Sequence, residues 1–480
     1  MRTETEKLAC VPARTGMLPF APERTLKCGR TRKLDSWRRT CAALMLCAAT
    51  TIASPAQTFK TLVSFDGSNG ATPAFIVQGR DGKLWGTTRG GGHPNCGTVF
   101  KMTSAGTLTT TFTFNCANGN DPESLTLGTD GNFYGNTFNG GSNNGGTIFK
   151  LNPRGALTVL LRFDGSDGAE PQASLAEGVD GNFYGVTFAG RSEWGTVFRI
   201  TPSGTLTTLH SFDFTDGAQP FAGPIQGTDG NFYGTTSTGD GSGTVYKITP
   251  KGALTVLYDF NPPGGSTPIG SLVQGRDGNF YGTTSYGGPD NDGTVFKITP
   301  SGILTTIHAF NGVDGRLPTG ALVQATDGNF YGATPYGGTK QEGTIFKMTP
   351  TGTVTVLHSF DGTDGALSFQ LIQDTDGKFY GLTNSGGMSN EGIVFRLALG
   401  LSPFVETLPT LGKVGTKVSI LGTNLTGATS VSFNGTAARF EVVSSSEITT
   451  TVPTGATTGK VKVTTPRRKL SSNVAFHVRK

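Results

Sequence analysis

The chain has 480 residues, of which 72 are glycine and only 15% are charged. This length allows more than one domain, and the composition suits many short strands joined by turns. The formal net charge of +5 is unevenly spread, because Lys and Arg outnumber Asp and Glu by ten to four in residues 1–56 and by ten to three in residues 402–480, and are outnumbered by 27 to 19 between them. Without its first segment the chain is close to neutral, which excludes a general electrostatic attraction to nucleic acid.

Residues 1–56 are predicted to be an export signal with a basic leader. Four basic residues between Arg32 and Arg39 precede the apolar run "CAALMLCAATTIA" and the small residues "SPA". This order is typical of a secretory signal peptide, and the apolar run is too short to span a bilayer. We therefore expect an exported, soluble mature chain in an extracellular, periplasmic or cell-surface location, without a transmembrane segment. Met17 is an alternative translation start.

A motif close to Asp-Gly-Asn-Phe-Tyr-Gly recurs through the middle of the chain. Its copies follow one another at separations of 48 to 50 residues and begin at Asp81, Asp130, Asp180, Asp229, Asp277, Asp327 and Asp376. A fixed period of this length indicates an array of small structural units. Each Asp-Gly is a tight-turn signal, and the Phe and Tyr after it point to opposite faces of a strand, which predicts a sheet covered on both faces.

Each unit contains four strand-like runs, which predicts an all-β fold with a seven-bladed β-propeller at residues 57–400. In the fourth unit the runs are residues 220–227, 231–236, 243–249 and 253–260. Residues 58–65 match the fourth-strand pattern without a first three, whereas the last unit has three strands and no fourth. We expect the N-terminal strand to complete the last blade and close the ring, which leaves no open edge. An open solenoid is the alternative.

Cys96 and Cys116 are predicted to form a disulfide. They are the cysteines that remain after the export signal, and the expected compartment is oxidising. Cys96 precedes the third run of its unit, residues 97–102, and Cys116 follows the fourth, residues 107–114. These runs form a hairpin in which the numbers of paired residues add to about 210. The numbers of the two cysteines add to nearly the same value, so Cys96 and Cys116 lie almost opposite each other and within the reach of a disulfide.

The repeated pattern "TDGNFYGTT…GG…GTVFKITPSGTLTTLHSF" resembles the GloVer-type tandem repeats of bacterial surface proteins with varied anchoring tails. The resemblance covers residues 58–397 in seven consecutive copies. It implies export and display at the cell surface. That family has no agreed biochemical activity, so the resemblance implies no catalytic residue.

The links between the second and third strands of the units are the most variable. Links alternate between the two ends of an up-and-down sheet, so these links share one face, opposite the constant Asp-Gly turns. Variable loops on a constant scaffold are a common place for recognition, and freely drifting surface loops are the alternative. The candidate ligand-binding residues on this face are Arg191, Glu193, Trp194, Tyr286, Asp290, Asp292, Tyr336 and Lys340.

The units contain no recognisable catalytic or metal-binding motif. The repeated Asp is explained by its turn. Three histidines, His210, His308 and His358, hold a place that Val63 and Leu161 hold in other units, which predicts packing residues and not metal ligands. We predict no cofactor and no metal site; weak calcium binding is an alternative because exposed carboxylates on flexible links bind Ca²⁺, and such carboxylates occur in residues 164–171, 213–220 and 361–368.

The repeated Asp-Gly motif does not occur in residues 401–480. Strands with alternating apolar and polar residues are expected there instead. One buried face is predicted from the period-two positions Val418, Ile420, Val431, Phe433, Val461, Val463, Val474, Phe476 and Val478. The runs "GTKVSILGTNL", "ATSVSFNGTAARF" and "VPTGATTGKVKV" resemble the IPT/TIG immunoglobulin-like domain along nearly its whole length. The resemblance implies an Ig-like β-sandwich with an interaction or spacer role. The family also has DNA-binding members, but an export signal argues against that use.

The function expected from these features is that of an exported, non-enzymatic surface or extracellular interaction protein, and we expect it to be a monomer. Its propeller face would bind a glycan, an envelope polymer or a surface protein, and the sandwich would be a spacer or attachment module. The alternative is a carbohydrate-active hydrolase or lyase, which needs two carboxylates or an equivalent acid/base pair in one pocket. A third hypothesis is binding of anionic envelope polymers by the basic loop of Arg467, Arg468 and Lys469.

Overall fold

The computed structural model describes residues 57–479 except 142, 191–192 and 263. The predicted export signal at residues 1–56 therefore lies outside the described residues. In the described part the regular elements are strands, which confirms the expected all-β fold. No helix within these ranges is long and apolar enough to cross a bilayer.

Seven four-stranded antiparallel sheets follow the repeat array, which confirms the predicted propeller blades. Blades 1 and 2 comprise β2 (Ala71–Gln78), β3 (Leu84–Gly90), β4 (Thr98–Met102), β5 (Leu108–Thr113), β6 (Asn120–Leu127), β7 (Phe133–Asn139), β8 (Thr147–Leu151) and β9 (Leu157–Arg162). Blades 3 and 4 comprise β10 (Ala176–Glu177), β11 (Phe183–Thr187), β12 (Thr196–Ile200), β13 (Leu206–Ser211), β14 (Ile225–Gln226), β15 (Phe232–Thr236), β16 (Thr244–Ile248) and β17 (Leu254–Asp259). Blades 5 and 6 comprise β18 (Val273–Gln274), β19 (Phe280–Thr284), β20 (Thr294–Ile298), β21 (Leu304–Ala309), β22 (Val323–Gln324), β23 (Phe330–Thr334), β24 (Thr344–Met348) and β25 (Val354–Ser359).

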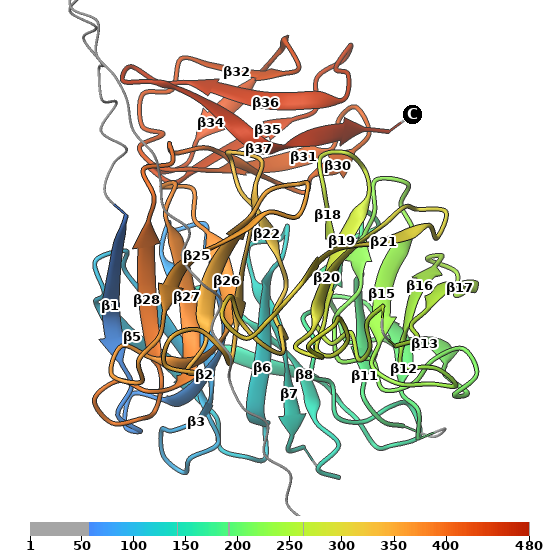
Figure 1. Ribbon diagram of the computed structural model, residues 1–480. Coiled ribbons are helices and arrows are strands. Elements are labelled where there is room, and N and C mark those ends of the chain that lie inside the picture. Colours follow the sequence, from blue (N-terminus) through green and yellow to red (C-terminus); the bar gives the residue numbers. More distant parts are fainter. Residues whose placement is uncertain (1–56, 142, 191–192, 263, 480) are drawn as a thin grey trace, which may run out of the picture. The chain divides into compact units, whose positions relative to one another are not determined.

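Blade 7 is completed by the first strand of the described chain. Its sheet has the order β1 (Thr58–Ser64), β28 (Ile393–Ala398), β27 (Phe379–Ser385) and β26 (Ala366–Gln373). Figure 1 shows β1 in blue beside β28 in orange, and Thr58 pairs with Ala398 at one end of this ladder. The prediction that the N-terminal strand closes the ring is confirmed. Because β1 supplies the fourth strand of blade 7, the edge of β28 is paired.

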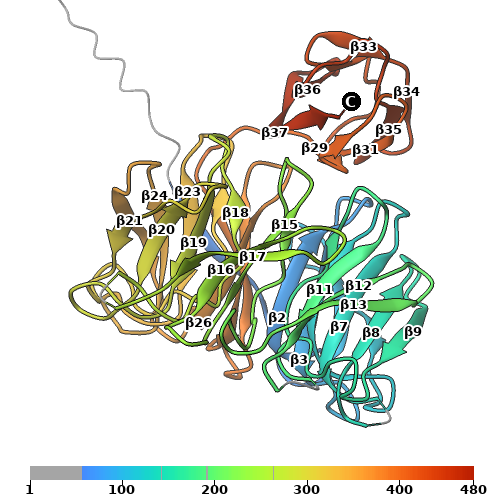
Figure 2. The same ribbon diagram turned by 90° about the vertical axis from the view of Figure 1, so that its right-hand side faces the viewer.

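The motif that repeats in the sequence joins each blade to the next. In Figure 2 the sheets of successive blades lie side by side from blue through green to orange. The Tyr of one motif stacks on the Phe of the next, as in Tyr184 on Phe232 with 3.8 Å between ring centroids and Tyr233 on Phe280 with 4.0 Å. Phe232 and Tyr233 are both about 1% exposed or less, so both faces of the strand are buried as predicted. Each pair therefore supplies packing between two sheets.

The first strand of the fourth unit was expected at residues 220–227, and this prediction is wrong in its extent. Only β14, Ile225–Gln226, pairs with β15 there. Units three to six have five residues between the Pro that opens this segment and the Gln or Glu that ends it, whereas units one, two and seven have four between their opening Pro or Ser and the corresponding Gln or Leu. The added residue shifts the ladder register, so blades 3 to 6 keep an isolated bridge such as Ala218 to Thr238 and a two-residue ladder.

The lengthened segments of units three to six lie where neighbouring blades approach each other closely, as glycines in units four and six show. A Cβ on Gly223 of blade 4 would collide with the carbonyl oxygen of Ser174 in blade 3. A Cβ on Gly320 of blade 6 would collide with the carbonyl oxygen of Phe369 in blade 7. Glycine is required at these two positions because only a residue without Cβ leaves room for the adjacent backbone.

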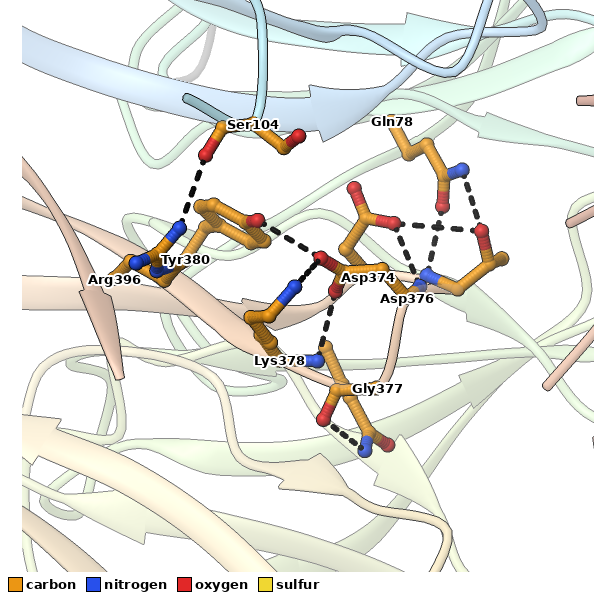
Figure 3. A network of polar contacts seen from close by, with 10 residues as sticks. Gln78, Ser104, Asp374, Asp376, Gly377, Lys378, Tyr380 and Arg396 are labelled. Carbon is orange, nitrogen blue, oxygen red and sulfur yellow. Dashed lines mark hydrogen bonds and ion pairs between the residues drawn. The ribbon is translucent and has the colours of Figure 1, made fainter. Parts of the chain in front are cut away.

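Polar contacts repeat around the ring and include the closing pair of blades. Gln274 Oε1 of blade 5 accepts the N–H of Thr228 in the blade 4 turn at 3.0 Å. At the closure, Gln78 of blade 1 makes the same contact with Thr375 of blade 7, where Oε1 accepts the N–H at 3.1 Å. Figure 3 shows this contact beside Asp374, Asp376 and Tyr380. The junction between the last and first blades thus keeps the polar contact that joins blades 4 and 5.

The C-terminal strands form two facing sheets of a sandwich. One sheet contains β29 (Glu406–Leu408), β31 (Lys417–Leu421), β35 (Glu447–Thr451) and β34 (Phe440–Val442). The other contains β30 (Leu411–Gly412), β37 (Lys469–Val478), β36 (Gly459–Thr464), β32 (Ser430–Phe433) and β33 (Thr436–Ala438). The buried core between them includes Val418, Ile420, Val431, Phe433, Val461, Val463 and Phe476, as predicted.

Val474 is the exception to the predicted sandwich core. It is 37% exposed, because the pairing of β36 with β37 jumps from Lys462–Ser471 to Lys460–Ala475. The extra residues of β37 bulge out of the ladder, which breaks the strict alternation between Leu470 and Phe476.

The predicted disulfide is present between Cys96 and Cys116. Their Cα atoms are 5.3 Å apart. Thr98 pairs with Thr113 at the same open end of the β4–β5 hairpin. The register expected from the sequence therefore places the two sulfur atoms beyond the last paired residues, where they bond.

Candidate functional site

One segment of every blade leads into the axis of the propeller in an unusual backbone conformation. The residue before the opening Pro, or before Ser368 in blade 7, has a φ between 50° and 62° in all seven units: Thr72, Asp121, Glu170, Gln219, Thr267, Leu317 and Leu367. Its N–H donates to a carbonyl oxygen of the preceding blade, as from Gln219 to Trp194 at 2.8 Å. A positive φ is uncommon outside glycine, so this hydrogen bond fixes the segment in a conformation that the chain would otherwise rarely adopt.

The segment directs the residue after that Pro or Ser into a central cavity of about 630 Å³. One residue from each blade contributes to this ring, in chain order Ala74, Glu123, Gln172, Phe221, Ile269, Thr319 and Phe369. We call these residues the rim ring. Pro335 and Tyr336, which begin a link between second and third strands, also line the cavity, so it lies on the side of the variable links.

The polar part of the rim ring is organised around Arg89 at the end of β3. Arg89 Nε donates to Glu123 Oε1 at 2.8 Å, and Nη2 donates to Glu123 Oε2 at 2.9 Å. This two-point geometry is the strongest form of an Arg–carboxylate contact. The guanidinium carbon also lies 5.7 Å from the centroid of the Phe369 ring in blade 7. Arg89 thus connects three blades across the ring closure.

Asp121 is a second carboxylate at the same arginine. Its Oδ1 lies 3.8 Å from Arg89 Nε and is a buried atom without a hydrogen-bond partner among the described residues. Burial raises the pKa of Asp121 to about 6, the charge of Glu123 adds to the rise, and Arg89 opposes it. Asp121 therefore changes its protonation near neutral pH, in contrast to an ordinary surface aspartate.

The opposite part of the rim ring is apolar. Phe221 of blade 4 packs edge-to-face on Phe188 of blade 3, with 4.9 Å between ring centroids. Phe188 occupies the same place in its unit as Arg89 in the first unit, and Phe221 the same place as Glu123. The same inter-blade position therefore holds an ion pair on one side of the cavity and an aromatic pair on the other.

The predicted ligand-binding residues do not converge on this cavity, except Tyr336, which lines it. Asp292 is 8% exposed and its carboxylate accepts a hydrogen bond from Arg316 Nε at 2.6 Å. Trp194 packs on Phe214, with 4.8 Å between centroids, and Tyr286 is 42% exposed in blade 5. Glu193, Asp290 and Lys340 are exposed in their links. Arg191 lies outside the described residues, and the role of all these residues in binding stays a prediction.

The motif aspartates have a structural role beyond the turn. Asp229 Oδ1 accepts the N–H of Asn231 at 3.0 Å, as expected of a turn, and Oδ2 accepts the hydroxyl of Tyr233 at 2.8 Å. The same Tyr-to-Asp bond occurs in blades 2 to 7, and in blade 1 Trp85 Nε1 donates to Asp81 at 3.2 Å. The aspartates thus hold the inter-blade aromatic residues in place.

The three histidines pack on the phenylalanine two residues later, with 4.9 to 5.1 Å between ring centroids, as expected of packing residues. Each also makes a polar contact that the sequence did not predict. His210, His308 and His358 each bond through Nε2 to an aspartate six residues later, at 2.6, 2.8 and 2.8 Å. Asp216 and Asp364 lie in two of the acidic links considered for calcium, and Asp314 lies in the corresponding link between blades 5 and 6. In those links Asp213 and Asp361 accept hydrogen bonds from their own loops. Among the described residues, no three His, Cys, Asp or Glu side chains are grouped as a metal site would need.

The basic loop of the sandwich is placed as expected. Arg467 and Arg468 lie between β36 and β37, and Lys469 begins β37; all three are exposed. Their binding of anionic polymers stays a prediction.

Sequence reasoning missed the rim ring, although a signal for it was present. The position after the opening Pro or Ser carries six different residue types in seven copies, with Phe occurring twice, between a repeated Pro or Ser and a repeated strand. The position varies in residue type at a constant place in each unit, whereas the longer links also differ in length and so give a stronger signal of variation. Residues that vary on a constant scaffold mark recognition only where the fold brings them together.

Two family models match the chain. The Gloeobacter/Verrucomicrobia repeat matches residues 48–241 and 187–395, and the IPT/TIG domain matches residues 404–478. Among proteins with curated descriptions none matches this chain.

Several solved structures are similar in fold at low identity. The extracellular domain of a proposed hybrid two-component system from B. thetaiotaomicron is 13% identical, with 84% of this chain and 52% of that chain covered and a TM-score of 0.48. PorZ, a surface component of the type-IX secretion system of Porphyromonas gingivalis, is 15% identical, with 87% and 61% covered and a TM-score of 0.46. A puromycin hydrolase is 12% identical, with 74% and 59% covered and a TM-score of 0.48. The chain thus spans about half to three fifths of the length of these proteins.

The repeat model covers well over half of the chain, and its two matched ranges together extend over the seven sheets up to residue 395. The protein therefore belongs to the Gloeobacter/Verrucomicrobia repeat family and carries a C-terminal IPT/TIG domain.

Proposed function

We propose that this protein is an exported surface or extracellular interaction protein whose propeller binds a glycan or protein ligand at the central cavity. Residues 57–400 would form the recognition module, and residues 401–480 would be a spacer or attachment module. The family of the repeats, the IPT/TIG domain and the predicted export signal support this assignment.

The rim ring is the observation that carries the proposal. Seven blades built from the same four strands place side chains of six different types around one cavity, with Phe occurring twice. A cavity of about 630 Å³ has the size of sites that enclose small ligands or the end of a longer one. If the segment had only a structural role, the same residue would serve equally well in every blade.

The test is to fill the cavity without disturbing the fold. Ala321 lines the cavity and is exposed, so Ala321→Trp adds bulk there. Val313, 74% exposed in the link that leads into the same blade, gives the matched control Val313→Trp. We expect the mature protein to bind a member of a glycan and peptide panel, Ala321→Trp to lose that binding, and Val313→Trp to keep it. Equal binding by both variants would place recognition elsewhere.

A second candidate function is hydrolysis or elimination on a glycan, and Asp121 is the observation that favours it. A carboxylate with a pKa of about 6, beside a second carboxylate, has the protonation behaviour of a general acid or base. An enzyme of this kind would release reducing or unsaturated ends from the bound glycan. Asp121→Asn would then abolish turnover and leave binding intact, whereas a binding protein would show no turnover in either form.

A further inference from the structure

We infer that the central cavity takes a neutral, hydroxyl-rich carbohydrate, such as the end of an uncharged oligosaccharide. This inference rests on the proposed function and names the ligand class of the same cavity.

Charge is the first reason. Among the described residues that line the cavity, the charged side chains are Arg89 and Glu123. Asp121, the second carboxylate at Arg89, is not among the residues that line the cavity. Both oxygens of Glu123 accept hydrogen bonds from Arg89, at 2.8 and 2.9 Å, so the two charges offset each other. An ionic ligand would have to break this contact to gain a partner of its own. The cavity therefore favours a ligand without net charge.

The remaining polar groups are the second reason. Gln172, Ser174, Ser271, Thr319 and Asn384 line the cavity with amides and hydroxyls. An amide or a hydroxyl both donates and accepts hydrogen bonds, as sugar hydroxyls do. Several such groups spread over blades 3, 5, 6 and 7 suit a ligand that carries many hydroxyls around a ring more than one with a single polar end.

Aromatic side chains are the third reason. Phe221, Phe369 and Tyr336 line the cavity, and Phe221 is held at a fixed inclination by Phe188 of the preceding blade. The C–H groups on one face of a sugar ring are apolar and pack on an aromatic side chain, which has a negative face. An apolar wall of Phe221 and Ile269 opposite the polar group of Arg89 and Glu123 therefore suits a ligand with one apolar face and a hydroxylated edge.

The experiment measures binding by calorimetry to neutral, anionic and cationic oligosaccharides and to peptides. The neutral probes are cello-, xylo-, malto- and N-acetylchito-hexaose, the anionic probe is an oligogalacturonate, and the cationic probe is a chitosan oligomer. We expect one of the neutral probes to bind, with an affinity that changes little with salt because no charge is involved. Phe221→Ala should weaken this binding by about tenfold.

Phe214→Ala is the matched control for Phe221→Ala. Phe214 is 37% exposed and packs on Trp194 outside the set of residues that line the cavity, so its loss should leave the affinity unchanged. Thermal unfolding of both variants shows whether they fold. Gln172→Ala is a second test with little risk to the fold, because it removes a half-buried polar side chain that lines the cavity. We expect it to weaken binding as well.

Three outcomes would overturn the inference, and they are distinguishable. Binding of only a charged probe or a peptide, still lost in Ala321→Trp, would refute the neutral carbohydrate and leave the proposed binding function in place. Failure of every probe to bind would refute the ligand class. Binding of a probe that is retained by both Ala321→Trp and Phe221→Ala would refute the cavity as the binding site and with it the proposed function.

Discussion

Tyr184 of blade 3 stacks on Phe232 of blade 4 with 3.8 Å between ring centroids, while its hydroxyl donates to Asp180 at 2.9 Å. This relationship repeats around the ring, so one short motif supplies a turn, a strand and a contact with the neighbouring sheet. Blade 1 departs from it, because Leu84 stands in the place of Phe232 and packs near Tyr380 of blade 7. The closing junction therefore lacks the aromatic pair.

Phe232→Leu reproduces the residue of blade 1 in the middle of the array. We expect the free energy of unfolding to fall by about 1–2 kcal/mol, from the lost aromatic pair and the reduced apolar contact. Denaturant unfolding measures this change. Phe214→Leu, at an exposed aromatic residue, is the control with an expected change near zero. An equal effect at both positions would contradict a special role for inter-blade stacking.

Acid should destabilise the propeller through its motif aspartates. Although burial raises the pKa of Asp130, hydrogen bonds from Asn132, Lys150 and the motif tyrosine lower it overall to about 2. A carboxylate with a lowered pKa contributes stability above its ordinary value of about 4, and this stability is lost as pH falls toward 2. We expect Asp130→Asn to flatten the loss of stability between pH 4 and 2. An unchanged slope in chemical unfolding at these pH values would contradict the prediction.

Leu161→His should give Asp167 a partner like the histidines in the last strands of blades 3, 5 and 6. Burial raises the pKa of Asp167, and the charge of Asp164 adds to the rise. In blade 6 burial has the same tendency, but the hydrogen bond from His308 lowers the pKa of Asp314 overall. We expect Leu161→His to lower the pKa of Asp167 in an NMR titration and to raise stability above pH 4, where the ionised form is favoured.

Val63→His is the control for that variant. The residue six places after Val63 is Asn69, so the introduced histidine meets an amide and gains no ionic partner. If the pKa of Asp167 stays raised in Leu161→His, a histidine at this position does not lower the pKa of the aspartate six residues later, and the prediction is wrong.

Asp374 should make the propeller less stable as pH rises. Burial raises its pKa to about 7, and the charge of Asp376 adds to the rise. The corresponding residue is glycine in the first five units and Ala325 in the sixth. Because the folded pKa lies above the unfolded value, stability is fully present below about pH 4 and is lost as pH rises through 7. Asp374→Gly should remove this part of the pH dependence, and Asp290→Asn, at an exposed residue, should not.

Loss of the disulfide should destabilise the folded chain. A bond across a sequence separation of 20 residues restricts the unfolded state by about 3 kcal/mol in the chain-entropy model. The β4–β5 hairpin orders this segment already, so we expect Cys96→Ser/Cys116→Ser to lower the free energy of unfolding by somewhat less. Mass spectrometry of the non-reduced mature protein checks the bond itself. Two alkylatable thiols in that protein would contradict the pairing.

The sequence by itself determined the repeat, the number of sheets and the closing strand. These features depend on neighbours along the chain: Asp229 and Gly230 form a turn, and Phe232 and Tyr233 alternate between two faces. A period that recurs seven times multiplies a weak local signal. The disulfide was predictable for the same reason, because Cys96 and Cys116 are related by one hairpin register.

Two local predictions failed where one strand departs from regular pairing. The added residue in units three to six breaks the first strand, and the bulge in β37 exposes Val474. Alternation along a single strand contains no information on its partner, so a shift in register cannot be read from it.

The candidate site was decided by the tertiary structure alone. Arg89 and Glu123 lie in different blades, and Phe221 and Phe369 are separated by three units of the array. They share one cavity because seven sheets converge on an axis and because a residue with positive φ turns each first strand toward it. Convergence is a property of the closed ring, whereas each repeat in the sequence records only its own turn and strands.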